Sequence, residues 1–205
     1  MTRFGCQMLS EGVLMSPRAH AALETSFTWG PYQVKNELAA FAQWCDDHVI
    51  QHVIEIGMHH GGTTALFLAL GCTVVGVDLP DGPYGGLQLG ACVARNDKLT
   101  AAYPKTFIGL LGDSHDPLMQ EAVGQLMPKA DLVFIDGDHA AYGVSRDYEH
   151  YKPLVRKGGY MAFHDITPAK EGYGVPAFWA SLDGSKTTIR HEAAEWGGIG
   201  IVQVT

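Results

Sequence analysis

Residues 53–64 read Val-Ile-Glu-Ile-Gly-Met-His-His-Gly-Gly-Thr-Thr, and residues 74–78 read Val-Val-Gly-Val-Asp. The first stretch predicts a short buried strand that breaks at a glycine-rich turn and continues as a helix, and the second predicts a strand closed by an acid. Gly57, Gly61 and Gly62 have no Cβ, which lets the turn pass close to a ligand. This strand–turn–helix–strand order is typical of half of an open parallel sheet that holds a nucleotide-like cofactor.

Further apolar runs, with helical patterns between them, extend this sheet. Strands are predicted at 106–113, 131–136, 159–165, 187–191 and 198–204, and helices at 33–47, 87–102, 117–127, 144–155 and 175–182. The runs are continuous rather than alternating, which indicates strands covered by helices on both faces. The connection before the last run is too short for a helical crossover, so the last two strands should be antiparallel. We therefore expect an α/β fold, a Rossmann-like doubly wound sheet of seven strands that is mostly parallel and ends in an antiparallel hairpin.

The length of 205 residues fits one main domain with a substantial core. Residues 1–30 scatter Gly, Pro and Ser among single aromatic residues, so we predict an irregular N-terminal arm there and a domain over 31–205. Phe4, Phe27 and Trp29 of this arm could cover a neighbouring subunit of a homo-oligomer.

Composition limits the partners and the compartment. The formal net charge of −8 argues against a nucleic-acid partner, which would require a basic face. The four cysteines have no C-x-x-C spacing and are expected to be reduced, and residues 1–12 lack the pattern of a secretion signal. We expect a cytoplasmic protein without a membrane segment, whose partner is a small-molecule substrate.

Four of the predicted strands end in an acid, namely Asp78, Asp113, Asp136 and Asp165. The carboxyl ends of parallel strands meet at one edge of the sheet, so these acids should converge on one crevice, where Asp78 can accept hydrogen bonds from ribose hydroxyls. Glu55 instead lies inside a strand, where its carboxylate must find donors. Those donors belong either to the cofactor or to an internal structural hydrogen bond.

Two short clusters go beyond cofactor binding. Asp136-Gly-Asp-His139 follows one strand, and His164-Asp165 ends the next. Neighbouring strands lie about 4.8 Å apart, so acids at matching ends can share a cation, and two carboxylates with an imidazole suit Mg²⁺, Mn²⁺ or Fe²⁺. The alternative is that His164 and Asp165 only order the loops. His139 is placed to take a proton near neutral pH, unless it is a loop histidine that bonds the backbone.

The Glu-Ile-Gly-x-x-x-Gly-Gly turn, Asp78 and Gly112-Asp113-Ser114 resemble the cofactor motifs of class I S-adenosylmethionine-dependent methyltransferases. A closer resemblance is to the cephalosporin-hydroxylase-like and macrolide-sugar O-methyltransferase branch, similar also to catechol O-methyltransferase. That resemblance covers roughly residues 33–204. It is carried by Phe-Ile-Asp-Gly-Asp-His at 134–139, Arg146-Asp147, Leu154, Gly158-Gly159 and Phe163-His164-Asp165.

The resemblance implies S-adenosylmethionine as cofactor. The implied cofactor-binding residues are Glu55, Gly57, Met58, His59, Gly61, Gly62, Thr63, Asp78, Leu79, Gly112, Asp113, Ser114 and Asp136. The turn would hold the methionine moiety, Asp78 the ribose, and Asp113-Ser114 the adenine edge.

The same resemblance implies a divalent metal, Mg²⁺ before Mn²⁺ or Fe²⁺, on Asp136 and Asp165, with His164 as the third ligand. His139 would be the general base, with Asp136 as the second catalytic residue. Two positions depart from the pattern. His164 stands where sugar-modifying relatives carry a carboxylate, and Ile166 stands where catechol-type relatives carry Asn.

We therefore expect metal-assisted methyl transfer to a hydroxyl of a small molecule, such as a sugar or a natural product. One alternative is an NAD(P)-dependent oxidoreductase, but its G-x-G-x-x-G fingerprint would need glycine where His59 stands. The other is a catalytically silent cofactor-binding module, which would have no need of convergent acids.

Overall fold

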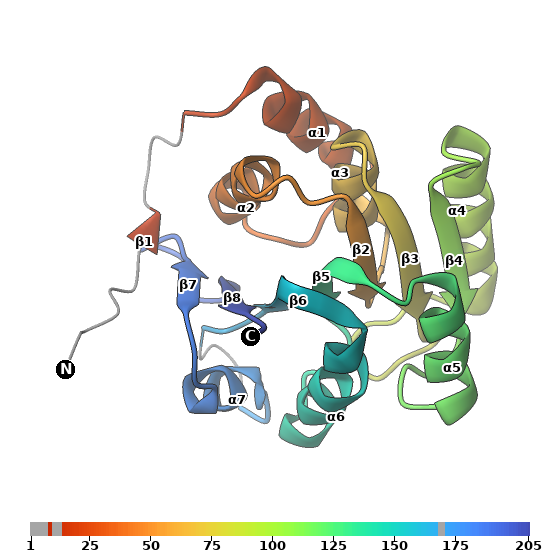
Figure 1. The fold of residues 1–205 in the computed structure, drawn as a ribbon. Helices are drawn as coiled ribbons and strands as arrows, with labels where there is room; N and C mark the ends of the chain where they lie inside the picture. Colours follow the sequence, from red (N-terminus) through yellow and green to blue (C-terminus); the bar gives the residue numbers. More distant parts are fainter. Residues whose placement is uncertain (1–7, 10–13, 168–170) are drawn as a thin grey trace.

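The computed structural model describes residues 8–9, 14–167 and 171–205. The described strands form one eight-stranded sheet in the order β1-β7-β8-β6-β5-β2-β3-β4 (Figure 1). The strands are β1 (Met8–Leu9), β2 (His52–Ile56), β3 (Thr73–Asp78), β4 (Phe107–Leu111), β5 (Ala130–Ile135), β6 (Val155–His164), β7 (Lys186–Ile189) and β8 (Ile199–Gln203). The helices are α1 (Pro17–Phe27), α2 (Lys35–Asp47), α3 (Gly62–Ala69), α4 (Leu89–Ala102), α5 (Pro117–Leu126), α6 (Ala141–Tyr151), the 3-10 turn η1 (Lys152–Leu154) and α7 (Val175–Ser181).

The predicted seven-stranded doubly wound sheet is confirmed in β2 to β8. The pairs from β4 across to β6 are parallel, and β8 runs antiparallel to both of its neighbours, β6 and β7. The two-residue β1 adds a parallel edge beyond β7. The chain order reverses between β2 and β5, so the crevice for a ligand should open at their carboxyl ends.

Helices cover both faces of the sheet, as the continuous apolar runs predicted (Figure 1). Buried residues of α1, α2 and α3, with Leu99 of α4, pack on one face, where Phe41, Phe67 and Phe134 have ring centroids 5.4 to 5.9 Å apart. Buried residues of α5, α6 and α7 pack on the other face. The two cores hold the sheet rigid beneath the loops that form the crevice.

The N-terminal arm was predicted to be irregular, and over residues 17–27 this prediction is wrong. Ser16 caps α1 through a hydrogen bond from the Ala19 amide, and Pro17 occupies the first turn. Ser26 in this helix donates to the carbonyl oxygen of Gly62 (2.7 Å), which holds α1 against the start of α3. The apolar face of α1 is mostly alanine, so its helical period is weak in the sequence. Residues 1–7 and 10–13 of the arm lie outside the described residues.

The described residues bear on two features that were considered from composition, the state of the cysteines and membrane-spanning helices. Cys45, Cys72 and Cys92 are free and buried, whereas Cys6 falls outside the described ranges. Among the described residues, no helix combines the length and the hydrophobicity needed to cross a bilayer.

Candidate active site

A cavity of about 860 Å³ opens at the carboxyl ends of the central strands. The sequence-predicted residues that line it are Gly57, Met58, His59, Gly62, Thr63, Asp78, Leu79, Gly112, Asp113, Ser114, Asp136, His139, His164 and Asp165. These residues come from the ends of β2, β3, β4, β5 and β6, so the sheet edge brings together segments that are far apart in the chain.

The glycine turn after β2 forms the floor of this cavity. Gly57 has φ +85°, and a Cβ on it would lie 2.1 Å from the carbonyl oxygen of Asp136. Only glycine therefore lets β2 end this close to the end of β5. The next amide, on Met58, donates to Asp78 Oδ1 (3.2 Å), which ties the turn to the acid that closes β3.

Glu55 and Gly61 were predicted to bind the cofactor, but they do not line the cavity. Gly61 precedes α3 with φ +87°. Burial raises the pKa of Glu55 to about 8, although a hydrogen bond from Thr64 (2.6 Å) opposes that rise. Of the two roles left open for Glu55, the structure shows the internal hydrogen bond.

A buried arginine that sequence reasoning missed holds Asp78. Arg95 of α4 pairs with Asp78 Oδ2 and also donates to the carbonyl oxygen of His59. The Arg95 and Asp78 side chains are only 4% and 9% exposed. The available signal was the helical spacing, since Cys92, Arg95 and Leu99 form the buried face of α4, and a cation on such a face requires an anionic partner.

At the end of β4, the two residues predicted to contact adenine differ in exposure. The Asp113 side chain is 57% exposed, and its Oδ1 accepts from the backbone amide of His115 (2.8 Å). Ser114 instead turns inward and donates to Asp147 Oδ1 (2.7 Å) on α6. His115 also lines the cavity, although the sequence assigned it no function.

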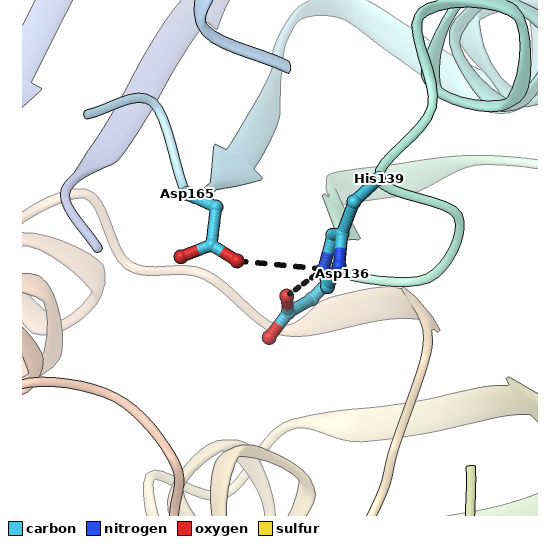
Figure 2. Close-up of side chains that lie close together, drawn as sticks. All are labelled: Asp136, His139 and Asp165. Carbon is cyan, nitrogen blue, oxygen red and sulfur yellow. Dashed lines mark hydrogen bonds and ion pairs between the residues drawn. The ribbon is translucent and has the colours of Figure 1, made fainter. Parts of the chain in front are cut away.

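Asp136, His139, His164 and Asp165 form a closed cluster of alternating acids and imidazoles. His139 Nε2 lies 3.4 Å from Asp136 Oδ1 and 3.5 Å from Asp165 Oδ2 (Figure 2). His164 Nδ1 lies 3.2 Å from Asp136 Oδ1 and 3.4 Å from Asp165 Oδ1. The predicted convergence of the acids at the ends of β5 and β6 is therefore observed, and both histidines belong to it.

Charge pairing inside the cluster outweighs burial. Burial lowers the pKa of His164, but the carboxylates of Asp136 and Asp165 raise it to about 9. Burial raises the pKa of Asp136, but the two imidazoles hold it well below its usual range. Asp136 and His164 are thus an ion pair at neutral pH.

The donor atoms of the cluster fit a divalent metal. Asp136, His139 and Asp165 each offer one ligand atom, and these atoms lie within 4.8 Å of one another. Two carboxylate oxygens and one imidazole nitrogen are a donor set that Mn²⁺ and Fe²⁺ accept, and Mg²⁺ accepts its oxygens. His164 Nδ1 lies 3.2 Å from Asp136 and 3.4 Å from Asp165, so the predicted ligand His164 is also within reach of an ion held by these acids.

Two aromatic side chains contact the His139 ring. The ring of Tyr173 stacks on it with centroids 4.7 Å apart, and the ring of Tyr84 meets it edge-on at 5.0 Å. Tyr32 meets the His59 ring edge-on at 4.8 Å on the other side of the turn, and Trp196 also lines the cavity. These aromatic residues lie in loops, where no periodic spacing in the sequence predicts which side chains face the cavity.

Gln33 is a further cavity residue that the sequence did not reveal. Its Nε2 donates to Asp136 Oδ2 (2.8 Å), and its Oε1 accepts from the Thr63 hydroxyl (3.4 Å). Gln33 therefore joins the acid cluster to the start of α3. Both partners are far from it in the sequence, so no local pattern could predict these contacts.

Comparison with known families and proteins shows what this chain is similar to. A family model described as a methyltransferase domain matches residues 54–166. The protein y4gI of Sinorhizobium fredii (strain NBRC 101917 / NGR234) is 27% identical in an alignment of 146 residues that covers 64% of this chain and only 15% of y4gI.

Solved structures share the fold at low sequence identity. Cofactor-bound Rv0187 from MTB has a TM-score of 0.61 at 19% identity, covering 92% of this chain and 90% of its own. The O-methyltransferase from Bacillus cereus in complex with SAH has a TM-score of 0.60 at 13% identity, covering 94% and 93%. MycE of the mycinamycin biosynthetic pathway, in complex with Mg, SAH and mycinamycin VI, has a TM-score of 0.60 at 14% identity, covering 92% of this chain and 55% of MycE.

Proposed function

This chain belongs to the methyltransferase-domain family, and we propose that it transfers the methyl group of S-adenosylmethionine to a hydroxyl group of a small molecule. The observation that carries the proposal is the cluster of Asp136, His139, His164 and Asp165, which lies in the same cavity as the glycine turn and Asp78. Membership of this family favours methyl transfer over the oxidoreductase alternative.

The donor would lie along the ends of β2, β3 and β4. The turn at Gly57 would hold its methionine moiety, Asp78 its ribose, and Asp113 and Ser114 its adenine. Arg95 fixes Asp78 at the cavity wall, so the acid needs no rearrangement when the donor binds. The donor's sulfonium already activates the methyl group, and the protein must mainly align donor and acceptor in line.

The acceptor hydroxyl must lose its proton to become a strong nucleophile. His139 is the group best placed to take this proton, because its Nε2 faces the cavity between two carboxylates that stabilise the imidazolium it would become. Tyr173 packs on the same ring and keeps it oriented. Asp136 would act through His139 by stabilising the imidazolium that forms when Nε2 takes the proton.

The proposal includes a divalent cation on Asp136 and Asp165 with His164 as the third ligand, which leaves His139 Nε2 free to take the proton. When bound, such an ion would lower the pKa of a hydroxyl next to it. The protein's own part is the donor set, whose two carboxylates neutralise the charge of the cation.

The charges around the cavity point to the kind of acceptor. The described lining residues include five aspartates and neither lysine nor arginine. An acceptor with a phosphate or carboxylate beside its reacting hydroxyl would meet these carboxylates, because the nearby cations Arg95 and His164 are already paired with acids of the cavity. We therefore expect an uncharged acceptor, packed against Tyr84 and Tyr173.

Labelled S-adenosylmethionine tests this function. The purified protein, with and without added Mg²⁺ or Mn²⁺, is incubated with tritiated methyl donor and pairs of neutral hydroxyl compounds and their carboxylated counterparts. Label should move to neutral members, with a mass gain of one methyl group, and excess EDTA should suppress it. Transfer only to amines or thiols would overturn the hydroxyl assignment, and full turnover in EDTA by a protein free of metal by elemental analysis would overturn the metal.

A further inference from the structure

We propose that Asp147 of α6 is a positioning residue for the donor site, which fixes Ser114 and His115 at the adenine end of the cavity. The inference rests on the proposed function, because it takes the wall at Asp113 and Ser114 as the place of the adenine ring. Asp147 itself does not line the cavity and acts from behind this wall.

The contacts of Asp147 lead to two cavity residues. Its side chain is 0% exposed. Its Oδ1 accepts from the Ser114 hydroxyl (2.7 Å) and lies 3.2 Å from His115 Nε2. One buried oxygen therefore sets the direction of two neighbouring side chains that a ligand in the cavity would meet.

Other residues of α6 hold the same segment. The carbonyl oxygen of Gly143 lies 3.2 Å from His115 Nε2, and Arg146 Nη2 donates to the carbonyl oxygen of His115 (3.3 Å). The Tyr151 hydroxyl donates to the carbonyl oxygen of Ser114 (2.9 Å). Gly143, Asp147 and Tyr151 are four residues apart and therefore lie on one face of the helix, so α6 fixes the segment after β4 along its length.

The arrangement costs stability, which indicates a purpose beyond packing. A fully buried carboxylate is expensive unless it is paired, and Asp147 Oδ2 has no hydrogen-bond partner. The partial remedy is His115, since the hydrogen bond from its ring to Asp147 raises the pKa of the imidazole despite burial. An apolar residue would fill this position at lower electrostatic cost, but it would leave Ser114 and His115 free to rotate.

Ligand fragments separate this role from general folding. Binding of S-adenosylhomocysteine and of methylthioadenosine, which has the adenosine but not the amino acid, is measured by calorimetry for the wild type and for Asp147→Asn. Asp147→Asn should bind both ligands about 10-fold more weakly than the wild type, because a hydrogen bond to a charged group contributes on this scale. The loss should be equal for the two ligands. Glu149→Gln removes one charge from an exposed position of the same helix and should bind both ligands as the wild type does.

A double-mutant cycle with His115→Gln supplies a readout that a purely structural role would not move. His115→Gln should weaken methylthioadenosine binding by a similar factor. Asp147→Asn should add little in that background, because the His115 ring is already gone and the Asn oxygen can still accept from the Ser114 hydroxyl. If Asp147→Asn fails to fold, His115→Gln and Ser114→Ala must still show the loss.

The outcomes of this experiment are distinguishable. A wild type that binds neither ligand overturns the proposed function, and this inference with it. If the wild type binds both ligands but folded Asp147→Asn binds methylthioadenosine as tightly as the wild type, only the positioning role is overturned. Unchanged affinity in His115→Gln has the same meaning if that variant alone folds. Strictly additive losses in the cycle would overturn it as well, since they would mean that Asp147 does not act through His115.

Discussion

At the scale of single residues, the chemistry of this site concentrates on His139, whose Nε2 lies between Asp136 and Asp165 in a partly enclosed cavity. The other residue on which the proposed function depends is Asp78. It is already neutralised by a buried arginine, so it presents oriented oxygens to a ligand without bringing an unpaired charge into the site.

Replacing His139 by alanine should slow methyl transfer by about 10²–10⁴-fold, the usual contribution of a general base. The affinity for S-adenosylhomocysteine should stay near that of the wild type, because the donor contacts come from β2, β3 and β4. Steady-state rates and calorimetry measure the two effects, with His20→Ala on the exposed side of α1 as the matched control. Near-normal turnover in His139→Ala would mean that another group of the cluster takes the proton from the acceptor.

Replacing Asp78 by asparagine should weaken S-adenosylhomocysteine by about 1–3 kcal/mol, the scale of hydrogen bonds to a charged group. The protein should also lose thermal stability, because Arg95 would be left buried without its anion. Calorimetry and melting curves check the two effects separately, and Asp97→Asn on the exposed face of α4 is the control. Unchanged donor affinity would remove Asp78 from the ribose site.

At the scale of elements, the sheet is fastened at the edge opposite the cavity by Asp131 of β5. Its Oδ2 accepts from the amides of Gln51 (3.0 Å) and His52 (2.9 Å), beside β2, and its Oδ1 pairs with Arg156 of β6. One carboxylate thus joins the starts of three neighbouring strands. This fastening places the ends of the same strands in register at the active site.

The ionisation of Asp131 predicts an acid-dependent loss of stability. Burial tends to raise its pKa, but the hydrogen bonds from Arg156 and the two amides hold it below its ordinary value of 3.8. A lowered folded-state pKa stabilises the protein above pH 3.8, and this contribution is lost as the pH falls through the folded-state value. Urea unfolding between pH 6 and pH 3 should therefore show a steeper decline for the wild type than for Asp131→Asn. Parallel declines in the two proteins would contradict this role.

At the scale of the whole molecule, the cavity joins segments from Gly30 to Trp196, so a bound ligand connects most of the fold. A ligand that binds only the folded state at 100 times its Kd stabilises that state by about 2.7 kcal/mol. S-adenosylhomocysteine should therefore raise the melting temperature by several degrees, and NAD at the same concentration should not. A rise in melting temperature with NAD but not with S-adenosylhomocysteine would instead favour the oxidoreductase alternative.

Local patterns in the sequence determined where the strands lie along the chain after residue 50, the glycine turn, the antiparallel end and the shared edge of the acids. They could do so because a buried parallel strand requires a continuous apolar run, and the carboxyl ends of parallel strands must coincide. Only the tertiary structure decided that α1 is a helix, that both His139 and His164 lie between the two acids, and that Arg95, Gln33 and Asp147 support the site. Gln33 meets Asp136 across 103 residues of sequence, and Ser114 meets Asp147 across 33. Contacts of this kind depend on which helix faces pack together, and that packing is a property of the whole core rather than of any local period.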